Sequence, residues 1–118
     1  MIHMCFRVCI FLFASVACFG QQGPALGEST RKYLSDLIRL DTSNPPGNET
    51  RVAMYLKQVV EAQGIACEVL GDDPKRLNFV ARLKGTGEGG RPLLMMAHSD
   101  VVPVDRKQWT VEPFAALV

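Results

Sequence analysis

Two stretches of the chain carry apolar residues at the spacing of an amphipathic helix. The first runs from about Ser29, a candidate N-cap, to Leu40. The second follows Asn48, another candidate N-cap, and Gly64 is suited to end it. Between them, residues 45–47 read Pro-Pro-Gly and cannot continue a helix. The two apolar faces consist of Tyr33, Leu34, Leu37, Ile38 and Leu40 in the first helix, and Val52, Tyr55, Leu56, Val59 and Val60 in the second.

Beyond Gly64 the hydrophobic pattern becomes typical of strands. Residues 65–70 form a candidate strand, and in residues 77–84 the side chains alternate in a way that gives one drier face. Residues 92–97 are apolar on both faces, which is the pattern of a central strand covered from both sides. Two helices followed by three strands predict an α/β layer sandwich.

The first twenty residues have the order of a secretory signal peptide. Arg7 and the amino terminus supply positive charge, residues 8–19 are apolar apart from Ser15, and Gly20 ends the run. This run is shorter than the roughly 20 residues that a membrane-spanning helix needs, which disfavours an uncleaved anchor. We therefore predict a signal peptide at residues 1–20, a linker at residues 21–28, and export to a periplasmic, secreted or lipid-anchored location.

The cysteines of the chain allow one alternative location, which is attachment to the membrane through a lipid. Cys18 follows Val16 and Ala17 in a weak match to a bacterial lipoprotein box, although Ser15 stands where that pattern usually has leucine. A lipid anchor at Cys18 is therefore an open alternative, and it is the only membrane contact that the sequence predicts. Outside the leader only Cys67 remains, and we interpret it as a small core residue and not as a nucleophile.

The charge balance excludes one class of partner. The chain has 13 Lys and Arg against 12 Asp and Glu, and Arg7 is the only charged side chain in the predicted leader. The remainder is formally neutral, so the sequence predicts no nucleic acid partner.

The apolar run at residues 92–97 is followed by His98 and Asp100. In extended backbone, side chains two residues apart point the same way, so both would face one site. A metal-bound imidazole usually donates its other N–H to a carboxylate or carbonyl, and Asp100 is within reach to accept it. A lone His-x-Asp also occurs by chance, and a hydrogen-bonded surface histidine is the alternative. Ser99 lacks the Gly-x-Ser-x-Gly elbow of a serine nucleophile.

Several motifs of the chain, in order, resemble one enzyme family. They are "LDTSNPPGNE", the glycine-ended helix, "NFVARLKG", and "LLMMAHSDVVPVD" followed by "QWTVEPF". Together they are similar to the amino-terminal part of the zinc-dependent aminoacylase, acetylornithine deacetylase, succinyl-diaminopimelate desuccinylase and glutamate carboxypeptidase family. The resemblance covers residues 29–118 and implies part of a zinc-exopeptidase-like layered α/β/α catalytic domain, incomplete in this chain.

The resemblance also implies a cofactor, a substrate class and site residues. His98 would be a zinc ligand, and Asp100 would be the catalytic residue that holds its imidazole. The complete enzyme would bind two zinc ions, with cobalt as a substitute, and would hydrolyse an amide in a peptide or an N-acyl amino acid. The other ligands and the general base would lie beyond Val118, so Glu112 is not assigned that role. A homodimer is an open expectation for the complete protein.

Other residues near these motifs receive structural roles. We expect Trp109 and Phe114 to pack near the rim of the site. Asp41, Thr42 and Asn44 are expected to cap and turn the loop between the helices, with lining of the cleft as the minor alternative.

The chain ends in "PFAALV", which resembles the start of another strand. We therefore expect an amino-terminal fragment of an exported zinc-dependent amide hydrolase, inactive alone. The alternative is a truncated, non-catalytic chain, either a scaffold or the product of a pseudogene.

Overall fold

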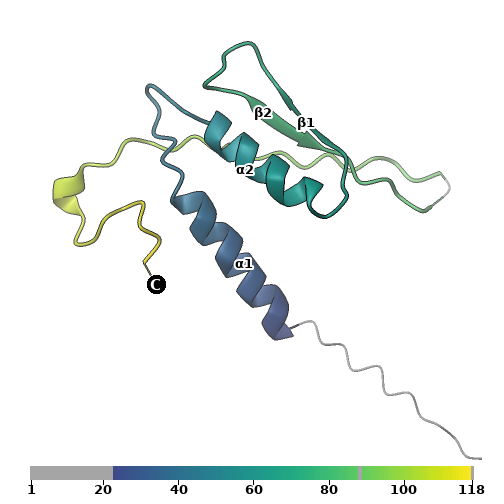
Figure 1. Cartoon of the computed structure of the whole chain (residues 1–118), viewed down its shortest axis with the longest axis horizontal. Coiled ribbons are helices and arrows are strands. Elements are labelled where there is room, and N and C mark those ends of the chain that lie inside the picture. The colour runs from purple at the N-terminus through teal and green to yellow at the C-terminus, as the bar shows by residue number, and fades with distance from the viewer. Residues whose placement is uncertain (1–22, 88, 118) are drawn as a thin grey trace, which may run out of the picture.

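The computed structural model describes residues 23–87 and 89–117, and the predicted signal peptide lies outside them. Two helices, α1 (Gly23–Ile38) and α2 (Thr50–Glu61), precede two strands, β1 (Cys67–Leu70) and β2 (Asn78–Ala81). A short 3-10 helix, Arg106–Gln108, follows within a long extended segment (Figure 1). The described part is thus a mixture of helix and strand, compatible with the predicted α/β class.

Helix α1 begins earlier than its apolar pattern predicted. Its first residue is Gly23, so residues 23–28 of the predicted linker are helical. Ala25, Leu26 and Glu28 have good helix propensity, which explains why the helix begins before Ser29. The Tyr55 hydroxyl of α2 donates a 2.9 Å hydrogen bond to Asp36 and joins the two helices. Neither described helix is both long and apolar enough to cross a membrane.

The two ends of α2 tested two predictions with opposite outcomes. Asn48 was predicted as the N-cap, but Glu49 occupies that position, and no side chain caps the helix there. At the other end, Gly64 has φ +71°, as expected for a helix terminator. Its N–H donates to the Glu61 carbonyl at 2.9 Å, and the Ile65 N–H donates to the Val60 carbonyl at 3.3 Å. These two bonds form a Schellman motif, which confirms Gly64.

Replacing Gly64 by alanine is expected to destabilise the chain by about 1 kcal/mol, since a Cβ disfavours the left-handed conformation. A Cβ at this position would meet no atom within 4 Å, so the loss would come from the backbone alone. Gly85→Ala is the matched control, because its surroundings are equally open and its φ is not positive. Urea denaturation of the two variants measures the difference. Equal unfolding midpoints would contradict this role for Gly64.

The strands β1 and β2 form an antiparallel pair, in which Cys67 lies opposite Ala81 and Leu70 lies opposite Asn78. These strands confirm the candidates at 65–70 and 77–84, with shorter bounds. Helix α2 packs against both strands and contributes the most buried apolar side chains of the described residues, Val52 and Ala53.

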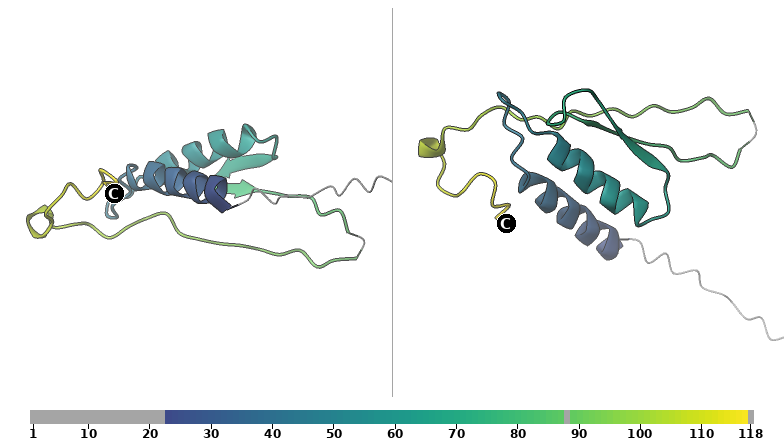
Figure 2. Two further views of the ribbon diagram at one scale, coloured as in Figure 1. Left: turned by 90° about the horizontal axis from the view of Figure 1, so that it is seen from below. Right: turned by 45° about the horizontal axis from the view of Figure 1, so that its top comes forward.

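The predicted central strand at residues 92–97 is wrong for the described structure. The segment is extended but pairs with neither β1 nor β2. Figure 2 shows it as part of a long open stretch that runs past the helices. The side chains of Leu93, Met95 and Met96 are each 84 % exposed. A strand needs a neighbour to accept its backbone hydrogen bonds, and an apolar pattern does not supply one. The three-stranded sandwich is therefore not formed by the described residues.

Candidate functional site

The loop between the helices meets the extended segment at the predicted site. Ser43 and Val101 form an isolated parallel bridge, although they are 58 positions apart in the chain. The Asn44 N–H donates to the Val101 carbonyl at 2.9 Å, and the Val101 N–H donates to the Thr42 carbonyl at 3.3 Å. These two bonds fix the backbone of residues 98–101 against residues 42–44.

Side chains strengthen this junction. The Thr42 hydroxyl donates a 2.6 Å hydrogen bond to the Ser99 carbonyl, and Thr42 is only 2 % exposed. Asp41 accepts hydrogen bonds from the Ser43 hydroxyl at 2.7 Å and from the Ser43 N–H at 3.0 Å. The hydroxyl bond, followed by the N–H bond, lowers the pKa of the Asp41 carboxyl. Hydrogen bonds within the loop thus stabilise it independently of its contact with the site.

His98 and Asp100 contact one another as their spacing predicted. His98 Nδ1 lies 3.0 Å from Asp100 Oδ1 and 3.0 Å from the Asp100 backbone carbonyl oxygen. A carbonyl oxygen only accepts, so Nδ1 carries the proton in this geometry. The neutral imidazole then has its free lone pair on Nε2. The His98 side chain is 86 % exposed, so a ligand can approach this nitrogen.

Asp100 has a second partner that the sequence did not reveal. Its Oδ2 accepts a 3.0 Å hydrogen bond from the Asn44 side-chain amide. This bond, followed by the one from His98, lowers the pKa of the Asp100 carboxyl. Asp100 is therefore a carboxylate at neutral pH, with each oxygen held by a different donor.

A partly buried ion pair lies beside the histidine and aspartate. The Arg76 guanidinium donates to Glu49 through Nε at 3.2 Å and Nη2 at 3.0 Å, and Glu49 is 8 % exposed. Glu49 raises the pKa of Arg76, with a smaller contribution from Asp100. Gly47, with φ +79°, makes room for the pair, because a Cβ there would lie 2.9 Å from the Glu49 carboxylate oxygens.

These groups border two hollows that both include residues 97–99. The first, of about 470 Å³, contains Glu49, Arg76, His98 and Asp100. The second, of about 520 Å³, is mostly apolar. The residues around the second hollow include Leu37, Ile38, Leu40, Thr42, Val52, Leu56, Val101, Val102, Val104, Trp109, Pro113 and Phe114. Trp109 and Phe114 therefore lie beside the site, where they were expected, and Trp109 is half exposed.

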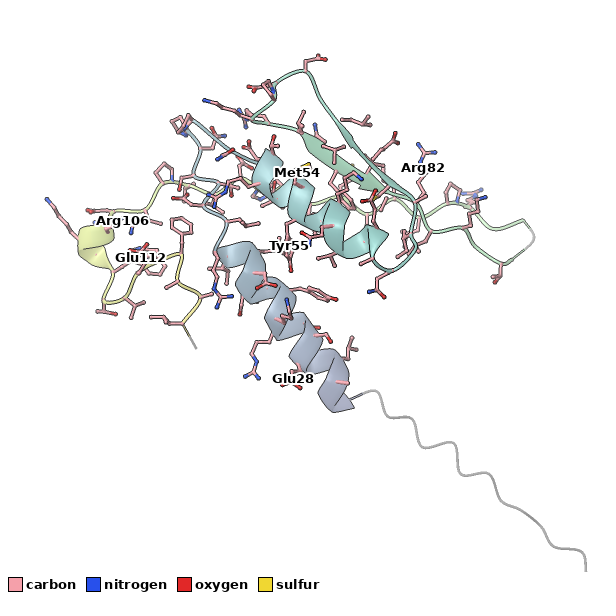
Figure 3. All side chains as sticks on the ribbon, in the orientation of Figure 1. Glu28, Met54, Tyr55, Arg82, Arg106 and Glu112 are labelled. Atoms are coloured by element: carbon pink, nitrogen blue, oxygen red, sulfur yellow. The ribbon has the colours of Figure 1, made fainter. Side chains whose placement is uncertain are left out.

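Glu112, which was assigned no catalytic role, has an ion-pair partner of its own. Its carboxylate pairs with the Arg106 guanidinium at the 3-10 helix, where Figure 3 shows both side chains.

The structure brings His98 and Asp100 together and adds Thr42 and Asn44 to the site. Thr42 and Asn44 were expected mainly to cap and turn the loop. Their contacts with residues 99–101 join segments that are far apart in the chain, which a local pattern does not reveal. The motif "DTSN" contained the loop residues that contact the site, but it did not reveal their hydrogen-bond partners. Within residues 23–87 and 89–117, no group of three or more His, Cys, Asp or Glu side chains is arranged to hold a metal ion.

The chain's relatives are enzymes named as deacylases. A probable succinyl-diaminopimelate desuccinylase from Staphylococcus aureus MRSA252 is 37 % identical over 84 residues, which are 70 % of this chain and 19 % of the relative. An acetylornithine deacetylase from Vibrio atlanticus is 40 % identical over 78 residues, which are 64 % of this chain and 19 % of the relative. An acetylornithine deacetylase from Aliivibrio fischeri MJ11 is 38 % identical over 81 residues, covering 69 % of this chain and 20 % of the relative.

The chain is thus a relative of hydrolases of the amidohydrolase type. More particularly, its sequence is similar to those of acetylornithine deacetylases and succinyl-diaminopimelate desuccinylases, which confirms the resemblance of its motifs. It spans about a fifth of the length of these relatives. No protein-family model and no solved structure matches the chain.

Proposed function

We propose that this chain forms the amino-terminal part of a metal-dependent hydrolase that cleaves amide bonds in N-acyl amino acids. The observation that carries the proposal is the His98–Asp100 pair, held by Asn44 in a chain related to deacylases. The names of the relatives favour deacylation over the peptidase and carboxypeptidase activities that the wider resemblance also implied.

The residues present fit one ligand position of a zinc site. Neutral imidazole is a common zinc ligand, and its second N–H usually donates to a carboxylate or a carbonyl. His98 does both through Nδ1, which leaves Nε2 for the ion. When bound, zinc lowers the pKa of its water and polarises the scissile carbonyl. The proposal assigns to this chain only the His98 ligand, out of the two-ion site expected for the complete enzyme.

The remaining site residues of this chain act by orientation and charge. Asp100 holds the imidazole in one tautomer and places a negative charge behind it. Thr42 and the bridge between Ser43 and Val101 keep the backbone under the pair in place. The Glu49–Arg76 pair keeps a cation beside the Asp100 carboxylate, at the polar hollow next to His98.

A complete protein that carries these residues is expected to hydrolyse N-acetyl or N-succinyl amino acids. A chelator should abolish the activity, and zinc or cobalt should restore it. The chain of residues 1–118, assayed in parallel, is expected neither to bind zinc at submicromolar concentration nor to hydrolyse these substrates. A complete protein that is folded and zinc-loaded, yet inactive on N-acyl amino acids and dipeptides, would overturn the proposal and favour the scaffold alternative.

The proposal includes export, on the evidence of residues 1–20. Residues 1–25 fused to a reporter are expected to carry it out of the cytoplasm, with cleavage between Ala17 and Gln21. Leu12→Arg interrupts the apolar run and is the matched control, expected to keep the reporter inside. A wild-type fusion that remains uncleaved in the cytoplasm would sink this part of the proposal. Labelled palmitate, with Cys18→Ser as control, decides whether Cys18 carries lipid.

A further inference from the structure

Among the residues that the structure describes, the Asp100 side chain links the His98 imidazole to the loop between α1 and α2. One carboxylate oxygen faces His98 Nδ1, and the other faces the Asn44 amide nitrogen, each at 3.0 Å. A carboxylate rotates easily, because its terminal torsion has broad minima. An Asp100 held only by an 86 % exposed histidine would therefore exchange its hydrogen bonds with water.

Asn44 is itself held in place, as a positioning residue must be. Its N–H donates to the Val101 carbonyl at 2.9 Å, one residue beyond the carboxylate that its side chain contacts. The following Pro45 restricts the backbone of Asn44 to extended conformations. The buried Thr42 hydroxyl binds the Ser99 carbonyl at 2.6 Å on the other side of the junction. The Asn44 side chain thus extends from a backbone segment that is hydrogen-bonded to residues 99–101.

We propose that Asn44 is a positioning residue that fixes the Asp100 carboxylate and, through it, holds the His98 imidazole in the Nδ1–H form. An amide suits this task because its NH₂ donates to a carboxylate and carries no charge of its own. Binding one oxygen of Asp100 aims the other at Nδ1, so Nε2 is left free. The meaning of that free nitrogen as a metal ligand rests on the proposed function, whereas the tautomer does not.

Nitrogen-15 NMR of the imidazole in the full 118-residue chain tests the proposal directly. The spectra are recorded without metal and at a pH where the ring is neutral, and His3→Ala assigns the signals, because His3 is the chain's other histidine. The wild type is expected to show mainly Nδ1–H at His98, and Asn44→Ala is expected to shift the population toward Nε2–H. Asn48→Ala is the matched control, because Asn48 is exposed in the same loop. It should leave the population unchanged.

Amide spectra of each variant show whether it is folded. If Asn44→Ala is unfolded, the isosteric Asn44→Asp replaces the donor by an acceptor and decides the question. A folded donor-free variant with the wild-type tautomer population would overturn the proposal. In the complete enzyme, Asn44→Ala should also weaken zinc binding, near the lower end of the about 10–100-fold range for supporting partners. If Asn44→Ala loses the Nδ1–H tautomer while the complete wild-type protein shows no hydrolase activity, the proposed function is refuted. The positioning role of Asn44 would still stand.

Discussion

Replacing His98 by alanine is expected to remove nearly all hydrolysis of N-acyl amino acids by a complete enzyme that carries these residues. The loss should exceed the roughly 100-fold that removal of a supporting partner costs, because a direct ligand is removed. Zinc content should fall in the same variant, since Nε2 of His98 is the nitrogen that the structure leaves free and exposed. Steady-state kinetics and metal analysis of the purified variant measure both effects.

His3→Ala is the matched control for this substitution. It removes the chain's other histidine, which lies in the predicted signal peptide, and should leave the activity and the zinc content unchanged. An enzyme with His98→Ala that keeps wild-type zinc content and turnover would show that His98 is only a hydrogen-bonded surface residue.

Replacing Asp100 by asparagine is expected to cost about 10–100-fold in activity or zinc affinity, the usual cost of losing a supporting partner. Both carboxylate oxygens of Asp100 accept a hydrogen bond, one from His98 and one from Asn44. An asparagine side chain has one oxygen and one NH₂, so it can accept from only one of these donors. If its oxygen faces Asn44, its NH₂ faces Nδ1 and favours the tautomer that protonates Nε2. The loss should therefore appear in zinc affinity as well as in kcat.

Asp72→Asn provides the matched control, because Asp72 is an exposed aspartate in the turn between β1 and β2. It removes the same charge away from the site and should change neither quantity. Wild-type kcat and zinc affinity in Asp100→Asn would contradict the assigned role of Asp100. Comparison with Asn44→Ala then separates the two contacts, since the tautomer should shift in both variants, while the negative charge is lost only in Asp100→Asn.

The sequence determined those features of this protein that depend on neighbours in the chain. The apolar spacing identified both helices, and Gly64 ended the second because a left-handed backbone favours a residue without Cβ. The His-x-Asp spacing brought His98 and Asp100 into contact, since residues two apart in extended backbone share a face. The ordered motifs also predicted the similarity to deacylases that the relatives confirm.

Only the tertiary structure decided what depends on distant residues. The apolar pattern of residues 92–97 predicted a central strand, but neither β1 nor β2 supplies the hydrogen-bonding edge that such a strand requires. The partners of Asp100 and Ser99 are Asn44 and Thr42, more than fifty residues earlier in the chain. A local sequence pattern identifies the residue types suited to a loop. A hydrogen bond between two distant segments forms only when folding brings its donor and its acceptor together.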